Sequence, residues 1–366
     1  MRNRGKLALT AAALFGVALL AVPLYTGVFG EEGPVLPQEA HFMLDPQLAG
    51  ILETEGGVAA VKYYEETLRS DPDRAYGCHA EAHVLGQSVA LAEGVGQAIT
   101  LAPALCQGGF LHGVLQVAAK QGESTAGLCA KLESDYVDGC AHGFGHLLAV
   151  VYPNSISDAL RTCTTFLTKD YPEGEKLVGR CGGGAAMEYG YALAREAGVF
   201  TASQEHATMG PAGPVKVNLN TEDLARPCAV LQEFSEKVPG VQHECLIHLG
   251  FFFMRSPASK PAEMYQSCKN AVRDEEELGY CLRSAGLRLV EQYIQNAGAA
   301  ENASAVKAVK TVCGQMPEND QEPCAVGGYQ SVYTSGLDFL SLDCSTAWQT
   351  AACREARSIV TAEQSQ

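Results

Sequence analysis

Five of the nine histidines in this chain lie in three short stretches that each contain a cysteine. His79 and His83 are four residues apart, His142 and His146 are four residues apart, and His112 stands between the two pairs. On a helix, residues at this spacing lie one turn apart on one face, so their imidazoles can bind a single transition metal ion. We therefore predict a His-rich site for one or two ions of Zn, Fe or Cu, with the metal ligands His79, His83, His112, His142 and His146.

The alternative is that these histidines belong to the core and make hydrogen bonds to loop carbonyls of the neighbouring helical unit. Glu188 is expected near the same depth and is the candidate catalytic residue, as a metal ligand or a general base. Glu81 and Asp138 are candidates for hydrogen bonds to the outer nitrogens of the ligands. If the protein is an enzyme, the simplest chemistry is hydrolysis by a metal-activated water.

The three stretches are copies of one motif that begins with cysteine and occurs seven times. Each copy follows a polar segment and opens an apolar run, which predicts the first turn of a helix in a repeated unit. The strict form C-x-x-G-x-x-H puts cysteine, glycine and histidine on one inward face, and its glycine lets a neighbouring backbone come close. The motif cysteines are Cys78, Cys106, Cys140, Cys181, Cys245, Cys281 and Cys324.

All fourteen cysteines follow residue 30 and none forms a C-x-x-C pair, which favours disulfides in an oxidising compartment. Five cysteines precede a motif cysteine by 11 to 18 residues, which predicts a disulfide within each helical hairpin. A sixth pair would close the C-terminus, and Cys78 and Cys106 either pair with each other or remain thiols beside the histidines. The predicted pairs are Cys129 with Cys140, Cys163 with Cys181, Cys228 with Cys245, Cys268 with Cys281, Cys313 with Cys324, and Cys344 with Cys353.

These features predict an all-α fold: an α-solenoid-like array of disulfide-stapled helical hairpins. The stretch from Pro227 to Arg283 (PCAVL, ECLIHLGFFF, SCKNAV and YCLRSAGLRL) resembles the disulfide-stapled Sel1/TPR-like helical repeat proteins. The resemblance implies an architecture of paired helices and assigns no functional residue. The spacing of the motif cysteines departs from a fixed repeat, since it varies from 28 to 64 residues.

The N-terminus predicts a membrane anchor. Residues 1–6 are basic, and residues 7–30 carry no charge over a length that can span a bilayer as a transmembrane helix. The basic flank favours a cytoplasmic tail, with the bulk of the chain in the periplasm or outside the cell membrane. A cleaved signal peptide is the alternative, because Val28 and Gly30 are small residues suited to a cleavage site.

Beyond a linker at 31–46, we predict His-rich helical repeats over 47–205, a loop at 206–222 and C-terminal helical repeats over 223–366. The segment HECLIH, from His243 to His248, resembles the zincin motif but has one residue too many, so we interpret it as structural. A net charge of −16 argues against nucleic acid as a partner.

The function predicted from the sequence is a membrane-anchored extracytoplasmic protein with a His-rich metal site, which would also suit a metal-dependent hydrolase. The alternative is a non-catalytic scaffold that binds an envelope protein or peptide.

Overall fold

The computed structural model describes residues 44–364 except 71–77, 102–104, 122–127, 130–131, 133, 171–173, 200–208, 211–212, 215, 255, 257–258, 298–301 and 335–341. The predicted all-α fold is confirmed for the described residues, in which the only strands are β1 (Met209–Gly210) and β2 (Gly213–Pro214). The predicted anchor at 7–30 lies outside the described residues. Among the described helices, none has the length and apolar character that a membrane crossing requires.

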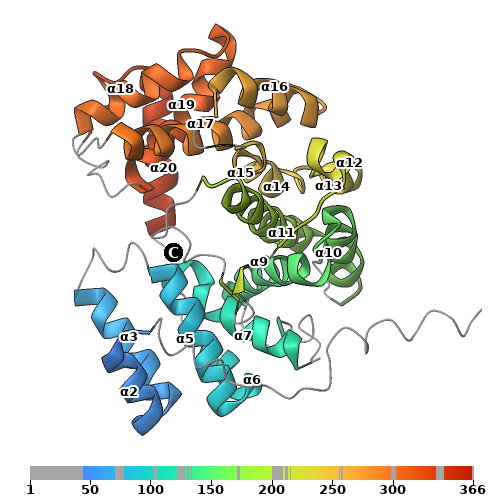
Figure 1. Cartoon of the computed structure of the whole chain (residues 1–366), viewed down its shortest axis with the longest axis vertical. Helices are drawn as coiled ribbons and strands as arrows, with labels where there is room; N and C mark the ends of the chain where they lie inside the picture. The colour runs from blue at the N-terminus through green and yellow to red at the C-terminus, as the bar shows by residue number, and fades with distance from the viewer. Residues whose placement is uncertain are drawn as a thin grey trace, which may run out of the picture.

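The helices follow one another in chain order around an arc (Figure 1). The N-terminal part comprises α2 (Pro46–Glu55), α3 (Gly57–Ser70), α5 (Cys78–Glu93), α6 (Val95–Ala98), η1 (Ile99–Leu101), η2 (Leu105–Gly108) and α7 (Gly109–Lys120). The middle comprises α9 (Ser134–Val151), α10 (Ile156–Asp170), α11 (Gly174–Glu196), α12 (Thr221–Ala225), α13 (Ala229–Phe234), α14 (His243–Leu246) and α15 (Leu249–Phe253). The C-terminal part comprises α16 (Pro261–Ala271), α17 (Glu275–Ala297), α18 (Asn302–Cys313), η4 (Glu318–Asp320), α19 (Gln321–Thr334) and α20 (Thr350–Gln364).

Three motif cysteines, Cys140, Cys181 and Cys281, lie well inside their helices, so the prediction of a first-turn position is wrong for them. Cys78 is the first residue of α5, whereas α9, α11 and α17 begin about two turns before their motif cysteines. The residues before Cys281 explain the error, since Glu275, Glu276 and Glu277 form the first turn of α17. Acidic side chains favour a helix N-terminus through the helix dipole. Their polarity therefore marks a helix start, where the sequence interpretation placed a loop.

Three pairs of helices cross with their backbones in direct contact, and we call them the glycine pairs: α5 with α7, α9 with α11, and α17 with α19. In the middle pair, a Cβ atom on Gly145 would lie 2.0 Å from the carbonyl oxygen of Cys181. Reciprocally, a Cβ atom on Gly184 would lie 1.9 Å from the carbonyl oxygen of His142. No side chain fits at such distances, so only glycine allows this crossing.

The other two glycine pairs repeat the same reciprocal contact. On every one of these helices, the carbonyl that contacts the partner's glycine belongs to the residue three positions before the helix's own glycine. The contacts are Gly86 with Phe110, Gly113 with His83, Gly286 with Cys324, and Gly327 with Arg283. The predicted role of glycine at the third position after the motif cysteine is confirmed in α11 and α19, whereas α9 and α17 use the fifth position.

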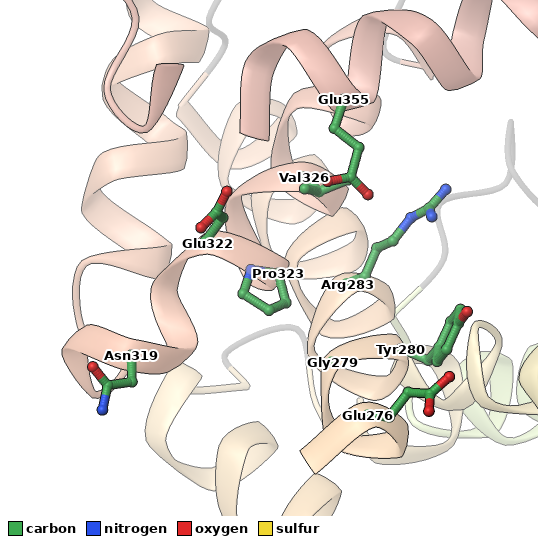
Figure 2. A pocket seen from close by; sticks show the side chains of 9 residues that line it. All are labelled: Glu276, Gly279, Tyr280, Arg283, Asn319, Glu322, Pro323, Val326 and Glu355. Atoms are coloured by element: carbon green, nitrogen blue, oxygen red, sulfur yellow. The ribbon is translucent and has the colours of Figure 1, made fainter. Parts of the chain in front are cut away.

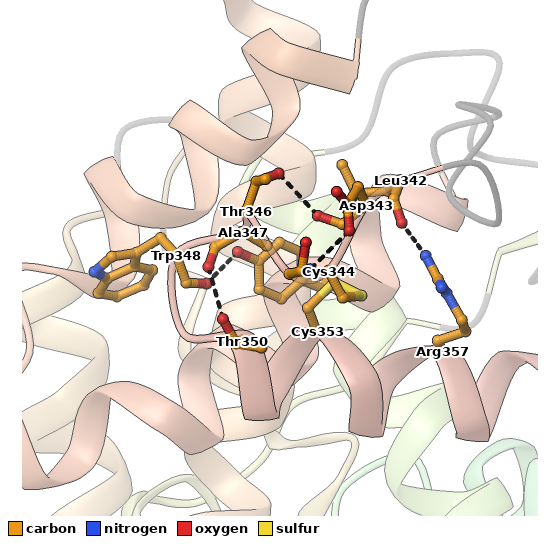
Figure 3. Close-up of a disulfide and its surroundings, with 11 residues drawn as sticks. Leu342, Asp343, Cys344, Thr346, Ala347, Trp348, Thr350, Cys353 and Arg357 are labelled. Atoms are coloured by element: carbon orange, nitrogen blue, oxygen red, sulfur yellow. Dashed lines mark hydrogen bonds between the residues drawn. A yellow bond between two sulfur atoms is a disulfide. The ribbon is translucent and has the colours of Figure 1, made fainter.

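All six predicted disulfides are formed, and Cys78 pairs with Cys106, the alternative that the sequence left open, so no cysteine is free. Each closes a loop short enough to stabilise the fold by about 3 kcal/mol in the chain-entropy account. The C-terminal disulfide, Cys344 with Cys353, fastens the segment before α20 to that helix (Figure 3). There Asp343 accepts a hydrogen bond from the backbone of Ser345, and Arg357 donates to the carbonyl of Leu342.

The apolar core consists of two clusters that divide within α9. The first runs from Leu44 to Cys140, and the second from Ala141 to Val360. The first glycine pair thus belongs to one core and the other two pairs belong to the second. The domain limits at 205 and 223 stay predictions.

We expect Gly145→Ala to lower the free energy of unfolding by about 2 kcal/mol or more, because the new methyl group would force α9 and α11 apart. Chemical denaturation followed by circular dichroism measures the change. Gly139→Ala is the matched control, since it lies on the same helix and a Cβ atom there would meet nothing within 4 Å. The control should be neutral or stabilising by up to about 1 kcal/mol. Equal effects of the two variants would contradict the crossing.

Candidate metal centre

Four of the five histidines predicted from the sequence meet where the first glycine pair packs on the second. His83 comes from α5, His112 from α7, and His142 and His146 from α9. The contact depends on Gly143, because a Cβ atom there would lie 2.5 Å from Cδ2 of His112. The glycine of the strict motif therefore makes room for an imidazole of the neighbouring helix.

Three of the imidazoles form a triangle, which we call the histidine triangle: His112, His142 and His146. Their ring centroids are 4.9 Å apart for His142 and His146, 5.1 Å for His112 and His146, and 5.5 Å for His112 and His142. The ring of His83 lies outside the triangle, 5.5 Å from that of His112. The side chain of His79 lies outside the described parts of the structure.

The histidine triangle is mostly enclosed by protein. His112 is 1% exposed, His146 3% and His83 6%. His142 is only partly buried, so solvent reaches the triangle at this residue. Burial of several imidazoles is costly unless their nitrogens bind protons, metal or hydrogen-bonding partners.

Glu188 of α11 orients one ring of the triangle. Its Oε2 lies 3.0 Å from Nδ1 of His146, and both side chains are almost fully buried. The opposite nitrogen, Nε2 of His146, is buried and has no hydrogen-bond partner among the described residues. The arrangement leaves the Nε2 lone pair available inside the protein when Nδ1 carries the proton. Asp138, which the sequence suggested for this orienting role, is instead exposed and pairs with Arg180 at 3.4 Å.

The polar contact between His146 and Glu188 has counterparts in the other glycine pairs. In the first pair, Nε2 of Gln87 donates to Oε1 of Gln116 at 2.5 Å. In the third, Nε of Arg283 donates to Oε1 of Gln330 at 2.7 Å. Each crossing therefore carries at least one polar contact between its two helices. The middle crossing uses a histidine and a carboxylate for it.

His248 belongs to the same neighbourhood, which the sequence interpretation missed. Its ring centroid lies 6.3 Å from that of His142, and burial lowers its pKa to about 3, helped by the charge of Arg288 and by His146. The helix is interrupted between α14 and α15, so the HECLIH segment is not one continuous helix. Its other histidine, His243, stacks on Tyr280 with ring centroids 4.0 Å apart. Only the packing of α15 against the earlier motif helices brings His248 to the cluster.

In the conformation described, no group of three or more His, Cys, Asp or Glu side chains is arranged so that it could hold a metal ion. This finding covers the described residues only, so it leaves out the side chain of His79.

A separate cavity of about 440 Å³ lies between α17, α19 and α20 (Figure 2). Glu276, Tyr280 and Arg283 line it from α17, while Glu322 comes from α19 and Glu355 from α20. Three carboxylates around one guanidinium give this cavity an acidic lining.

Comparisons with known protein families, curated proteins and solved structures found no match. The resemblance to the Sel1/TPR-like repeat proteins therefore stays a prediction, and the function rests on the site itself.

We expect neutral His146 to carry its proton on Nδ1, because Glu188 accepts a hydrogen bond there. Long-range ¹H–¹⁵N correlation spectra of the imidazoles measure the tautomer. Glu188→Gln keeps an acceptor and should keep the tautomer, whereas Glu188→Ala removes it and should destabilise the fold by about 1–3 kcal/mol. A proton found on Nε2 in the unaltered protein would contradict the assignment.

Proposed function

We propose that this protein binds a transition metal ion at the histidine triangle, in an extracytoplasmic compartment. His112, His142 and His146 are the ligands, and Glu188 holds the His146 ring in place. The observation that carries the proposal is the unpartnered Nε2 of buried His146, whose other nitrogen meets a carboxylate. Metal-ligating histidines usually make such a contact to a carboxylate or carbonyl, which fixes the ring and its tautomer.

The spacing of the rings supports the same conclusion. Zinc binds imidazole nitrogen at about 2.0–2.1 Å, which places each ring centroid roughly 3.2 Å from the ion. Tetrahedral angles then separate the centroids by about 5.2 Å. The observed separations of 4.9, 5.1 and 5.5 Å lie on both sides of this value.

Binding requires the rings to turn, because the conformation described does not present a ready ligand group. The torsion that turns an imidazole is broad, so reorientation about χ2 costs little when space permits. His142 has most freedom, since it is only partly buried. His112 and His146 are held more tightly by α9 and by Glu188.

An all-nitrogen ligand set suits Zn, Fe or Cu. Three histidines leave a fourth position for water or a substrate, the arrangement on which metal-assisted hydrolysis depends. In this proposal Glu188 acts as a positioning residue, because its contact with Nδ1 of His146 orients a ligand. His83, one ring further from the centre, and His79 on the same helix would extend the site towards a second ion.

The seven disulfides support an oxidising location for the described part of the chain. We propose that residues 7–30 hold it at the inner membrane, with the bulk of the chain in the periplasm or an equivalent compartment.

A second candidate function is a scaffold that binds a protein or peptide of the cell envelope. The acidic cavity of Figure 2 favours it, because carboxylates from α17, α19 and α20 face a space of about 440 Å³. Its lining suits a basic side chain of a partner. The scaffold function requires no metal, so measuring the metal content of the purified protein distinguishes it from the metal-binding function.

We expect the purified full chain to bind one Co²⁺ or Zn²⁺ ion at the histidine triangle with micromolar or tighter affinity. Cobalt should show the visible absorption of a nitrogen-ligated tetrahedral ion, and calorimetry gives the stoichiometry. His112→Ala and His146→Ala should abolish binding, and Glu188→Gln should weaken it by about 10- to 100-fold. His243→Ala is the matched control, since this ring stacks on Tyr280 away from the triangle, and should change nothing. Absence of metal binding in the unaltered chain would overturn the proposal.

We expect the full chain to sediment with membranes and to be released by detergent but not by high salt or carbonate. The reason is that residues 7–30 form an uncharged segment long enough to span the bilayer. Fractionation followed by N-terminal sequencing measures both properties. A soluble protein whose first residue lies near Glu31 would show that the segment is a cleaved signal peptide.

A further inference from the structure

The disulfide between Cys78 and Cys106 differs from the other six in what it joins. It ties α5 to η2, the short turn that leads directly into α7, and so connects the two helices of the first glycine pair. The other six are closed within 9 to 18 residues of sequence, whereas this one spans 28. Reduction of this disulfide therefore removes the covalent link between α5, which carries His83, and the turn that leads into α7, which carries His112.

This disulfide is also the most accessible to a reductant. Cys106 is partly exposed and Cys78 is 7% exposed, whereas the remaining twelve cysteines are between 0% and 4% exposed. Thiol–disulfide exchange requires a thiolate to reach a sulfur atom, so accessibility governs which bond reacts first. Cys106 provides the point of attack.

The backbone at Cys106 adds a second reason for lability. Its φ of 61° lies in the left-handed region, which is unfavourable for a residue with a side chain. Only one other described non-glycine residue, Gln349, shares this conformation. Once the bond to Cys78 is broken, the turn at η2 is free to leave this conformation.

The turn at η2 lies against a proposed metal ligand. A Cβ atom on Gly108, the last residue of η2, would lie 3.4 Å from Nε2 of His112. Tyr64 supports the turn from the other side, since its hydroxyl donates to the carbonyl of Cys78 at 2.9 Å and lies 3.6 Å from Sγ of Cys106. Movement of η2 therefore changes the support of the His112 ring.

We propose that the Cys78–Cys106 disulfide is a redox-sensitive control of the metal site, and that its reduction by a dithiol weakens metal binding at the histidine triangle. The inference rests on the proposed function. The dithiol would be a small molecule or a protein with a C-x-x-C motif, acting from the solvent side of Cys106.

The exchange balances as a two-electron transfer. One thiolate of the dithiol attacks Sγ of Cys106 and forms a mixed disulfide, while the Cys78 sulfur leaves as a thiolate and takes up a proton. The second thiol of the reductant then attacks the mixed disulfide and releases Cys106 as a thiol. The dithiol becomes a disulfide, and both electrons and both protons end on the two cysteines.

The first arm of the test uses the folded full chain with increasing dithiothreitol, followed by alkylation and peptide mapping. We expect Cys78 and Cys106 to be alkylated before any other cysteine. If another pair, such as Cys344 with Cys353, reacts first, the proposal is overturned. This arm needs no metal, so it tests the lability independently of the proposed function.

The second arm compares Co²⁺ affinity of the oxidised chain with that of the chain reduced at this pair alone. We expect reduction to raise the dissociation constant by about tenfold or more. The double variant Cys78→Ser/Cys106→Ser should match the reduced chain, and Cys344→Ser/Cys353→Ser should match the oxidised one, with circular dichroism checking the fold. Unchanged or tighter binding after reduction would overturn this inference alone. An oxidised chain that binds no Co²⁺ would overturn the proposed function with it.

Discussion

The close crossing of backbones at glycine is the constraint on which the rest of this structure depends. At Gly145 and Gly184 two helices approach until a carbonyl oxygen of each occupies the space of a side chain on the other. Such an approach fixes the rotation and height of both helices, because neither can slide without a clash. The side chains beside the crossing, among them His142 and His146, therefore have set positions before any of their own interactions form. Disulfides add stability to this arrangement without determining it.

Sequence reasoning recovered six of the seven disulfides and brought His83, His112, His142 and His146 together, and it failed where packing decides. The disulfide partners could be predicted because each cysteine lies a short chain length from its partner, as Cys163 does from Cys181. The convergence of His112 with His142 and His146 followed from their shared inward face. Glu188 was expected near the histidines as a metal ligand or general base, whereas the hydrogen bond to a histidine was assigned to Asp138. The contact of Glu188 with Nδ1 of His146 forms only across the crossing of α9 and α11, which sequence proximity does not reveal. His248 was lost for the same reason, since a break between α14 and α15 turns it towards His142.

The three crossings show how one backbone arrangement accepts different polar chemistry. Two glutamines, a histidine with a glutamate, and an arginine with a glutamine each make a polar contact between paired helices. The three crossings share the same glycine contacts although their polar pairs differ, so the path of the backbone does not depend on which polar pair is present. The backbone crossing therefore allows histidines to gather beside it, but the crossing itself does not require them. For this reason the glycine and cysteine positions are enough to predict the fold, whereas the site also depends on which polar side chains lie beside each crossing.

The division of the core within α9 has a consequence for cooperativity. Cys140 belongs to the first core and Ala141 to the second, so the continuous helix α9 contributes side chains to both cores. Its histidines face His112 from the first half and Glu188 from the second. Unfolding of either half would remove the packing on one face of α9 and so lower the stability of the other half. A metal ion at the histidine triangle, as proposed, would link the two halves thermodynamically, because it would bind only when both are folded. Binding there would therefore raise the stability of both halves together.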